Sequence, residues 1–542
     1  MNVGQARVRL VMAGAACVAA TLIAGCGSEY SSVITPVNPS GPASQVESYV
    51  VAVSSPSATA KGTASVIDYS GDSILAQATI GVGPRLFSLD SSGSTGYTLN
   101  SDGTIYTFPV STKLQTKNVS YLTLPSGAEP VNFFTPASGL WISDQHNNQA
   151  DVLTGSPLSV KYEIPLASQP VMAMSTTSVG QRDFIIEQGL DATDGTTVLD
   201  SNGYDCNSSP RTVNGNGIVE SVEIASYTIS SKLSLVPSYN SANTVDDYAA
   251  GLTTTSNVAR CPVYGVQSTD GKRLFVLNRG SDTISVINSS TAALDDCYPY
   301  AGQDGRTVNC HPVLPLSTTA VINTGYEPTN PDTANLPTTA GPVYAEYNIA
   351  TQQLVVANYD GGTVSIIDVS LDEYGNDSAT FGTTYTVKVG KTSKPLPASV
   401  TVLYDGSAAY TANQGDGTAN GTVSAINLTS HTLTKTLDVT GFPRTVVSTQ
   451  NSEYSKVYAA APNSPYLTIV NSATNVIDTS LLVSAGNIID VRTTTQNGSS
   501  TNYQYTTRTP GFGQPCNLPP SQVTSDTLSA CQALPGTSSG AD

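Results

Sequence analysis

Three segments of this chain repeat the same succession of short β-strands. They span residues 261–288, 341–368 and 398–427. Each has an alternating apolar stretch, a turn often marked Asp-Gly, a second strand ending in Asn, and a third strand close to Thr-Val-Ser-x-Ile-Asp/Asn. A fourth strand that ends near a proline completes the unit. Four antiparallel strands in roughly 40 to 50 residues are typical of a β-propeller blade. The repeat therefore predicts an all-β propeller of four-stranded antiparallel blades.

The number of blades follows from the residues that open each unit. The predicted starts are Pro84, Pro130, Pro170, Pro262, Pro342, Pro395, Pro443 and Gly486. Before the first start, residues 49–53, 64–69 and 74–80 supply only three strands, and residues 487–492 supply a spare one. Pairing the spare C-terminal strand with these three would close the ring and hide both sheet edges. This count predicts eight blades; seven is the alternative, because the unit starting at Pro130 is weakly patterned.

Short polar residues recur at the turns and strand ends. Asp270-Gly271 and Asp405-Gly406 combine an Asx acceptor with a residue that tolerates positive φ, as tight hairpins require. Asn278, Asn358 and Asn413 each end a second strand, where an amide can bond to neighbouring backbone. Because these residues recur in nearly every unit, we interpret them as structural rather than ligand-binding.

The repeated strands resemble those of the YVTN-repeat, lactonase-like family of β-propellers. Leu-Phe-Val-Leu-Asn278 and Leu-Val-Val-Ala-Asn358 stand where that family has its Tyr-Val-Thr-Asn strand. The resemblance covers about residues 47–495 and implies the propeller fold. Lactonases of this kind place acidic and His or Arg residues in the central channel. No residue of this chain could be matched to them from the sequence, so the activity is not carried over.

The N-terminus resembles the export signal of a bacterial lipoprotein. Arg7 and Arg9 precede an uncharged apolar run over residues 10–24, which is shorter than the roughly 20 residues of a membrane-spanning helix. The run ends at Ile23-Ala24-Gly25-Cys26, with Leu22 before it, which is similar to a lipobox. This resemblance implies a signal peptide over 1–25, diacylglycerol on Cys26 and a flexible tether over 26–46. Gly27 in place of Asp implies the outer membrane, if the cell has one.

Six further cysteines remain in the exported chain. They are Cys206, Cys261, Cys297, Cys310, Cys516 and Cys531. An even number in an exported protein indicates disulfides. We expect the pairs 206–261, 297–310 and 516–531, because the first joins two long connections on one face of a blade and each of the others brackets a short stretch. The last pair would staple an irregular tail over 496–542. No Cys-x-x-Cys spacing supports a metal site instead.

Three insertions interrupt the repeat, near residues 190–217, 237–260 and 291–341. They hold Tyr204, Tyr239, Tyr248, Tyr298, Tyr300 and Tyr326. Tyrosine offers contact area at low entropic cost, and loops on a rigid scaffold commonly carry recognition. These tyrosines are therefore candidates for a binding rim, with a mere capping role as the alternative.

The composition excludes some functions and leaves others open. The 542 residues carry 41 acidic and 23 basic side chains, a formal net charge of -18, which disfavours nucleic acid as a partner. The three histidines, His146, His311 and His431, lie apart, so we expect no haem, metal or other cofactor. We expect a monomeric envelope protein that binds a protein, glycan or small ligand. A lactonase-like hydrolase using acidic residues in the channel, and a purely structural envelope protein, are the alternatives.

Replacing the lipidated cysteine tests the anchor. Cys26→Ala removes the thiol that would carry diacylglycerol, so we expect the variant to leave the membrane fraction after a carbonate wash, whereas the unaltered chain stays. Several acyl chains would be lost, each methylene contributing about 0.8 kcal/mol of membrane affinity. Fractionation followed by immunoblotting gives the measurement. A Cys26→Ala chain that remains in washed membranes would refute lipidation at this position.

Overall fold

The computed structural model describes residues 48–136, 139–174, 182–188, 217–235, 259, 261–289, 313–316, 340–372, 375, 377–417, 419–449, 455–484 and 486–494. This part of the chain holds 32 strands and one short 3-10 helix, η1 (Thr116–Asn118). The strands form eight sheets of four antiparallel strands each. Within these residues, no helix has the length and apolar character needed to cross a membrane.

We number the sheets as blades 1 to 8 from the first complete one. Blades 1 to 4 consist of β4 (Pro84–Leu89), β5 (Thr95–Asn100), β6 (Thr104–Pro109) and β7 (Ser120–Thr123); β8 (Pro130–Phe134), β9 (Leu140–Asp144), β10 (Gln149–Thr154) and β11 (Ser159–Pro165); β12 (Pro170–Met174), β13 (Arg182–Glu187), β14 (Ile218–Glu223) and β15 (Thr228–Ser234); and β16 (Pro262–Gln267), β17 (Arg273–Asn278), β18 (Thr283–Asn288) and β19 (Val313–Pro315).

Blades 5 to 8 follow the same order of strands. They consist of β20 (Pro342–Asn348), β21 (Gln353–Asn358), β22 (Thr363–Asp368) and β23 (Thr384–Lys388); β24 (Pro397–Val402), β25 (Ala408–Asn413), β26 (Thr422–Asn427) and β27 (Thr432–Asp438); β28 (Thr445–Ser448), β29 (Lys456–Ala460), β30 (Tyr466–Asn471) and β31 (Val476–Leu482); and β32 (Asn487–Thr493), β1 (Tyr49–Ser55), β2 (Lys61–Asp68) and β3 (Ile74–Val82).

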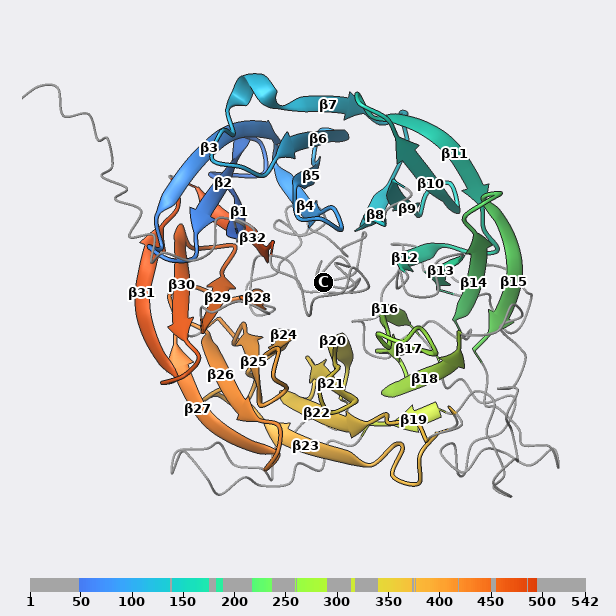
Figure 1. The fold of residues 1–542 in the computed structure, drawn as a ribbon, viewed down its shortest axis with the longest axis vertical. Helices are drawn as coiled ribbons and strands as arrows, with labels where there is room; N and C mark the ends of the chain where they lie inside the picture. The colour runs from blue at the N-terminus through green and yellow to red at the C-terminus, as the bar shows by residue number, and fades with distance from the viewer. Residues whose placement is uncertain are drawn as a thin grey trace, which may run out of the picture. The chain divides into compact units, whose positions relative to one another are not determined.

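The blades are arranged in a ring, with the first strand of each blade innermost and the fourth outermost (Figure 1). Each innermost strand contacts the innermost strands of both neighbouring blades, including β32 with β4. The protein is therefore an eight-bladed β-propeller. The eight-blade prediction is confirmed, and the seven-blade alternative is wrong because the weakly patterned unit at Pro130 forms a complete sheet.

Blade 8 joins the two ends of the ring. The C-terminal strand β32 pairs antiparallel with β1, with Val50 opposite Thr493 and Ser55 opposite Asn487. Beyond the strands, the Tyr49 amide donates to Thr494 Oγ1 at 2.7 Å and the Thr494 amide donates back to the Tyr49 carbonyl at 2.9 Å. The predicted closure by a spare C-terminal strand is thus confirmed.

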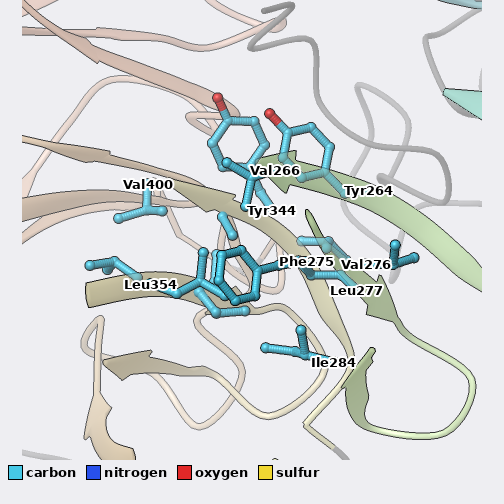
Figure 2. Close-up of a cluster of buried hydrophobic side chains, with 14 of the residues drawn as sticks. Tyr264, Val266, Phe275, Val276, Leu277, Ile284, Tyr344, Leu354 and Val400 are labelled. Carbon is cyan, nitrogen blue, oxygen red and sulfur yellow. The ribbon is translucent and has the colours of Figure 1, made fainter. Parts of the chain in front are cut away.

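Apolar side chains fill the spaces between blades, because both faces of each sheet pack against a neighbour. In β17 every residue is buried, whereas in the outer strand β31 none is. Figure 2 shows one such cluster, in which Tyr264 of β16 and Tyr344 of β20 stack with ring centroids 4.6 Å apart. Phe275 and Leu354 are wholly buried in the same cluster. Burial of this kind supplies the main stabilising free energy of the fold.

The recurring Asn residues connect the second and third strands of their blades. Asn413 Nδ2 donates to Thr422 Oγ1 at 3.1 Å and to Ser424 Oγ at 2.9 Å, and its Oδ1 accepts from Thr411 Oγ1 at 2.8 Å. Asn278 and Asn358 make the same two donations to their own Thr and Ser partners. These contacts are the ones that a structural role requires.

The two Asp-Gly turns also have the predicted geometry. Gly271 and Gly406 have φ angles of 71° and 72°, which glycine adopts without the steric cost that a Cβ would add. The Asp405 side chain accepts the Ser407 amide at 3.0 Å, and Asp270 accepts the Lys272 amide at the same distance. Local turn chemistry therefore sets these two hairpins.

Removing one of these Asn side chains should destabilise the ring without altering its shape. Asn413→Ala deletes three buried hydrogen bonds, so we expect the free energy of unfolding to fall by about 2–3 kcal/mol. Urea denaturation followed by circular dichroism measures this change. Asn427→Ala is the control, since its side chain is exposed and accepts the Thr429 and Ser430 amides, which water can replace. Equal effects of the two substitutions would contradict the proposed role.

Candidate functional site

Most residues predicted to form functional sites lie outside the described part of the chain. These are Cys26, Cys206, Cys297, Cys310, Cys516, Cys531, His311 and the six tyrosines Tyr204, Tyr239, Tyr248, Tyr298, Tyr300 and Tyr326. Cys261 is described: it is buried immediately before β16 and is disulfide-bonded. Its pairing with Cys206 and the other two pairings remain predictions. His146 lies in the turn after β9, and His431 stacks on Tyr385 at 3.7 Å between ring centroids.

Blades 4, 5 and 6 share an Asn–Ser arrangement, and two earlier blades carry acidic residues in its place. In blade 4, Asn278 lies opposite Pro262 of the first strand, and Ser285 of the third strand lies opposite Val276. The same register positions hold acidic residues in two earlier blades. They are Asp144 and Asp151 in blade 2, and Glu187 and Glu220 in blade 3. A neutral hydrogen-bonded pair is therefore replaced twice by a pair of carboxyl groups.

The acids of blade 2 have partners. Asp144 Oδ1 accepts the Glu129 amide at 2.9 Å and the His146 amide at 3.1 Å, and its Oδ2 accepts from Asn147 Nδ2 at 2.8 Å. Asp151 Oδ1 accepts from Gln149 Nε2 at 2.6 Å, and burial raises the pKa of Asp151 to about 6. Asp144 therefore holds a turn, and the local hydrogen bonds explain both residues.

The acids of blade 3 are less well satisfied. Glu187 is wholly buried and its Oε2 accepts the Ser168 amide at 2.5 Å, while Glu187 and Glu220 share a hydrogen bond. Glu187 Oε1 and Glu220 Oε2 have no partner among the described residues. Burial, and then the neighbouring Glu220, raise the pKa of Glu187 to about 9. Burial also raises the pKa of Glu220. The pair therefore holds a proton at neutral pH.

A basic cluster lies at the inner strands of blades 6, 7 and 8. Arg444 follows Pro443 directly before β28, the place that Val263 takes after Pro262. Its amide donates to the Ala460 carbonyl at 2.9 Å, and its carbonyl accepts from Ser399 Oγ of β24 at 2.8 Å. The side chain is wholly buried, and Nε, Nη1 and Nη2 all lack a hydrogen-bond partner in the described part of the chain.

Two charged residues of β32 act on this guanidinium. Burial lowers the pKa of Arg444 to about 10; Asp490 opposes that shift and Arg492 adds to it. Arg492 Nη2 donates to Asp490 Oδ2 at 2.6 Å, whereas Arg492 Nε and Nη1 have no partner among the described residues. Arg444 stays protonated at neutral pH, so two guanidinium groups share one carboxyl group. Several N–H groups of Arg444 and Arg492 therefore have no acceptor among the described residues.

Both clusters escaped the sequence-based interpretation, although the repeat contained a signal for each. Glu187 stands where the repeat has Asn, and Arg444 stands where it has Val after Pro. In the described ranges, no group of three or more His, Cys, Asp or Glu side chains is placed to hold a metal ion. Hydrogen bonding, proton transfer and charge recognition are the chemistry that these residues offer.

No protein-family model matches this sequence, and no curated protein sequence matches it. Solved propeller structures do resemble the fold. AztD from Citrobacter koseri has 12% identity and a TM-score of 0.47 over 82% of this chain and 97% of that one. The periplasmic gluconolactonase PpgL from Pseudomonas aeruginosa has 14% identity and a TM-score of 0.42 over 82% of this chain and 99% of that one. Identities this low say nothing about the ligand or activity of this chain.

The shared proton of the acid pair predicts a pH-dependent stability. In the folded protein the pKa of Glu187 is raised above its unfolded value of about 4.3. The contribution of its protonated carboxyl group to the free energy of unfolding is therefore fully present below about pH 4.3 and is lost as the pH rises towards 9. Glu187→Gln keeps the shape and removes the titration. We expect this variant to gain about 1–3 kcal/mol relative to the unaltered protein between pH 5 and pH 8.

Urea denaturation midpoints of both proteins at several pH values give the measurement. Asp478→Asn is the matched control, because Asp478 is exposed on the outer strand β31 and its substitution should leave the stability difference between pH 5 and pH 8 unchanged. A Glu187→Gln variant whose stability keeps the pH dependence of the unaltered protein would show that this pair does not share a proton.

Proposed function

We propose that this protein is an exported lipoprotein whose propeller acts as a binding module at the cell envelope. The lipobox-like sequence before Cys26 supports the anchor, and Gly27 supports the outer membrane where one exists. The tether over 26–46 would hold the propeller clear of the bilayer. The Leu-Val-Val-Ala-Asn358 type of strand supports placing the chain in the YVTN-repeat family as a divergent member.

The observation that carries the binding role is a set of buried Arg and Glu side chains whose polar atoms are partly or wholly unpaired among the described residues. Buried polar atoms in proteins are nearly always hydrogen-bonded, and an unpaired one costs about 1–3 kcal/mol or more. The repeat shows that the fold does not need them, since Val263 and Asn278 fill the same positions in blade 4. Local rules are commonly broken at functional sites. A bound ligand that pairs with these groups gives them a use that a purely structural envelope protein lacks.

Hydrolysis is the second candidate, and one observation favours it. Glu187 keeps its proton at neutral pH through burial and through Glu220, which is the state required of a general acid. A lactone or ester substrate that displaced Glu220 from its hydrogen bond with Glu187 would receive the Glu187 proton on its leaving oxygen. The binding role needs fewer assumptions, because no nucleophile or activated water accompanies the pair among the described residues.

A panel of small ligands tests the binding role on the full-length mature protein. We expect at least one class among oxyanions, amines, neutral sugars and lactones to raise the melting temperature by several degrees, since a ligand that binds only the folded state stabilises it. Arg444→Met or Glu187→Gln should remove that response. Asn413→Ala is the control that lowers stability and keeps the response.

A panel without any response, or a response that survives both substitutions, would contradict binding at these clusters. An assay for hydrolysis of the lactones, in which pH-stat titration measures the acid released, separates the two candidate functions. Turnover that Glu187→Gln abolishes would favour the enzyme.

A further inference from the structure

Arg444 differs from the other well-buried arginines of the propeller. Arg273 donates to Asp377 through Nε at 3.1 Å and Nη2 at 2.9 Å. Arg279 donates to Asp360 at the same two distances. Each therefore has a carboxylate that accepts two guanidinium hydrogen bonds, on one oxygen for Arg273 and on both oxygens for Arg279. Arg444 has no such partner in the part of the chain that the structure describes.

The charge around Arg444 is not balanced within the described residues. Asp490 is the nearby carboxyl group, and its Oδ2 is already held by Arg492 at 2.6 Å. Two guanidinium groups facing one carboxyl group leave one positive charge, in a place that water does not reach. Burying a charge without a partner is strongly unfavourable, so a site of this kind is completed by an anion.

The unused donors define what that anion must offer. Arg444 presents all of its side-chain nitrogens, and Arg492 presents Nε and Nη1. Guanidinium groups bind carboxylate and phosphate through parallel N–H···O bonds to two oxygens. A small oxyanion with two or more accepting oxygens matches these donors, whereas a neutral sugar would leave the charge unpaired.

We propose that Arg444 and Arg492, oriented by Asp490, form a binding site for a small oxyanion, a carboxylate or a phosphate, at the inner strands of blades 7 and 8. This proposal rests on the binding role proposed above and names the ligand class for one of its two clusters. Ser399, through its bond to the Arg444 carbonyl, fixes the backbone from which the guanidinium extends. The strands β28 and β32 contact each other, which brings this second arginine, paired with Val51 on β1, to the site.

The test measures binding of inorganic phosphate and of citrate to the full-length mature protein by calorimetry and thermal melting, at constant ionic strength. We expect one or both probes to bind and to raise the melting temperature. Arg444→Met should abolish this response. Arg444→Lys, which keeps the charge and loses the planar fork, should weaken binding by about tenfold or more. Response to phosphate alone or to citrate alone identifies the oxyanion.

The melting temperature measured without added oxyanion distinguishes an arginine that binds a ligand from one that stabilises the fold. Arg444→Met removes an unpaired buried charge, so it should melt at the same temperature as the unaltered protein or higher. Arg85→Met is the matched control, since Arg85 follows Pro84 at the same strand position of blade 1 and lies near Glu129; it should leave the oxyanion response intact.

Two results would overturn the oxyanion site: no response to either probe, or an Arg444→Met protein that melts well below the unaltered one without oxyanion and still responds to it. If another ligand class in the panel binds and Glu187→Gln removes that binding, the binding role stands and only the oxyanion site fails.

Discussion

The pairing of β1 with β32 is the contact on which the whole ring depends. An open propeller would end in two unpaired sheet edges, and such edges associate with other chains. The closure is reinforced across the neighbouring blade: Lys456 of β29 donates to Asp72 at 2.6 Å, and Gln77 of β3 donates to the Val483 carbonyl at 2.8 Å. Asp490 and Arg492 lie on this closing strand β32, which contacts β28, the strand that follows Arg444.

The fold could be predicted from the sequence because several blades repeat the same local chemistry. Asn278 and Asn358 each precede a Thr and a Ser of the next strand by 5 and 7 residues. Three strands without a fourth at one end of the chain required a partner at the other. The clusters could not be predicted in this way. Glu187 and Glu220 are separated by an insertion, and their closeness depends on strand register. Arg444 directly precedes the first strand of blade 7 and Arg492 lies in the first strand of blade 8, so their closeness depends on how these two blades pack together.

The predicted recognition loops and the clusters of the inner strands represent two different ways for a propeller to bind. The loops would offer tyrosine surface at one rim, whereas the clusters offer charge and hydrogen bonding on the rigid inner strands. The two clusters also differ in character, since blade 3 carries a protonated acid pair and blades 7 and 8 carry excess positive charge. Blades 3 and 7 lie on opposite sides of the ring, so the two clusters are separate (Figure 1).

Ring closure also has a consequence for how the chain is made. Tyr49 and Thr494 are 445 positions apart, so the innermost contact of blade 8 joins nearly the first and last strands synthesised. If the chain crosses a membrane from its N-terminus, β1, β2 and β3 emerge as a three-stranded sheet with one open edge. That edge stays unpaired until the remaining seven blades have followed. The final folding step is therefore a non-local one, and the interval before it is when the chain most needs protection from aggregation.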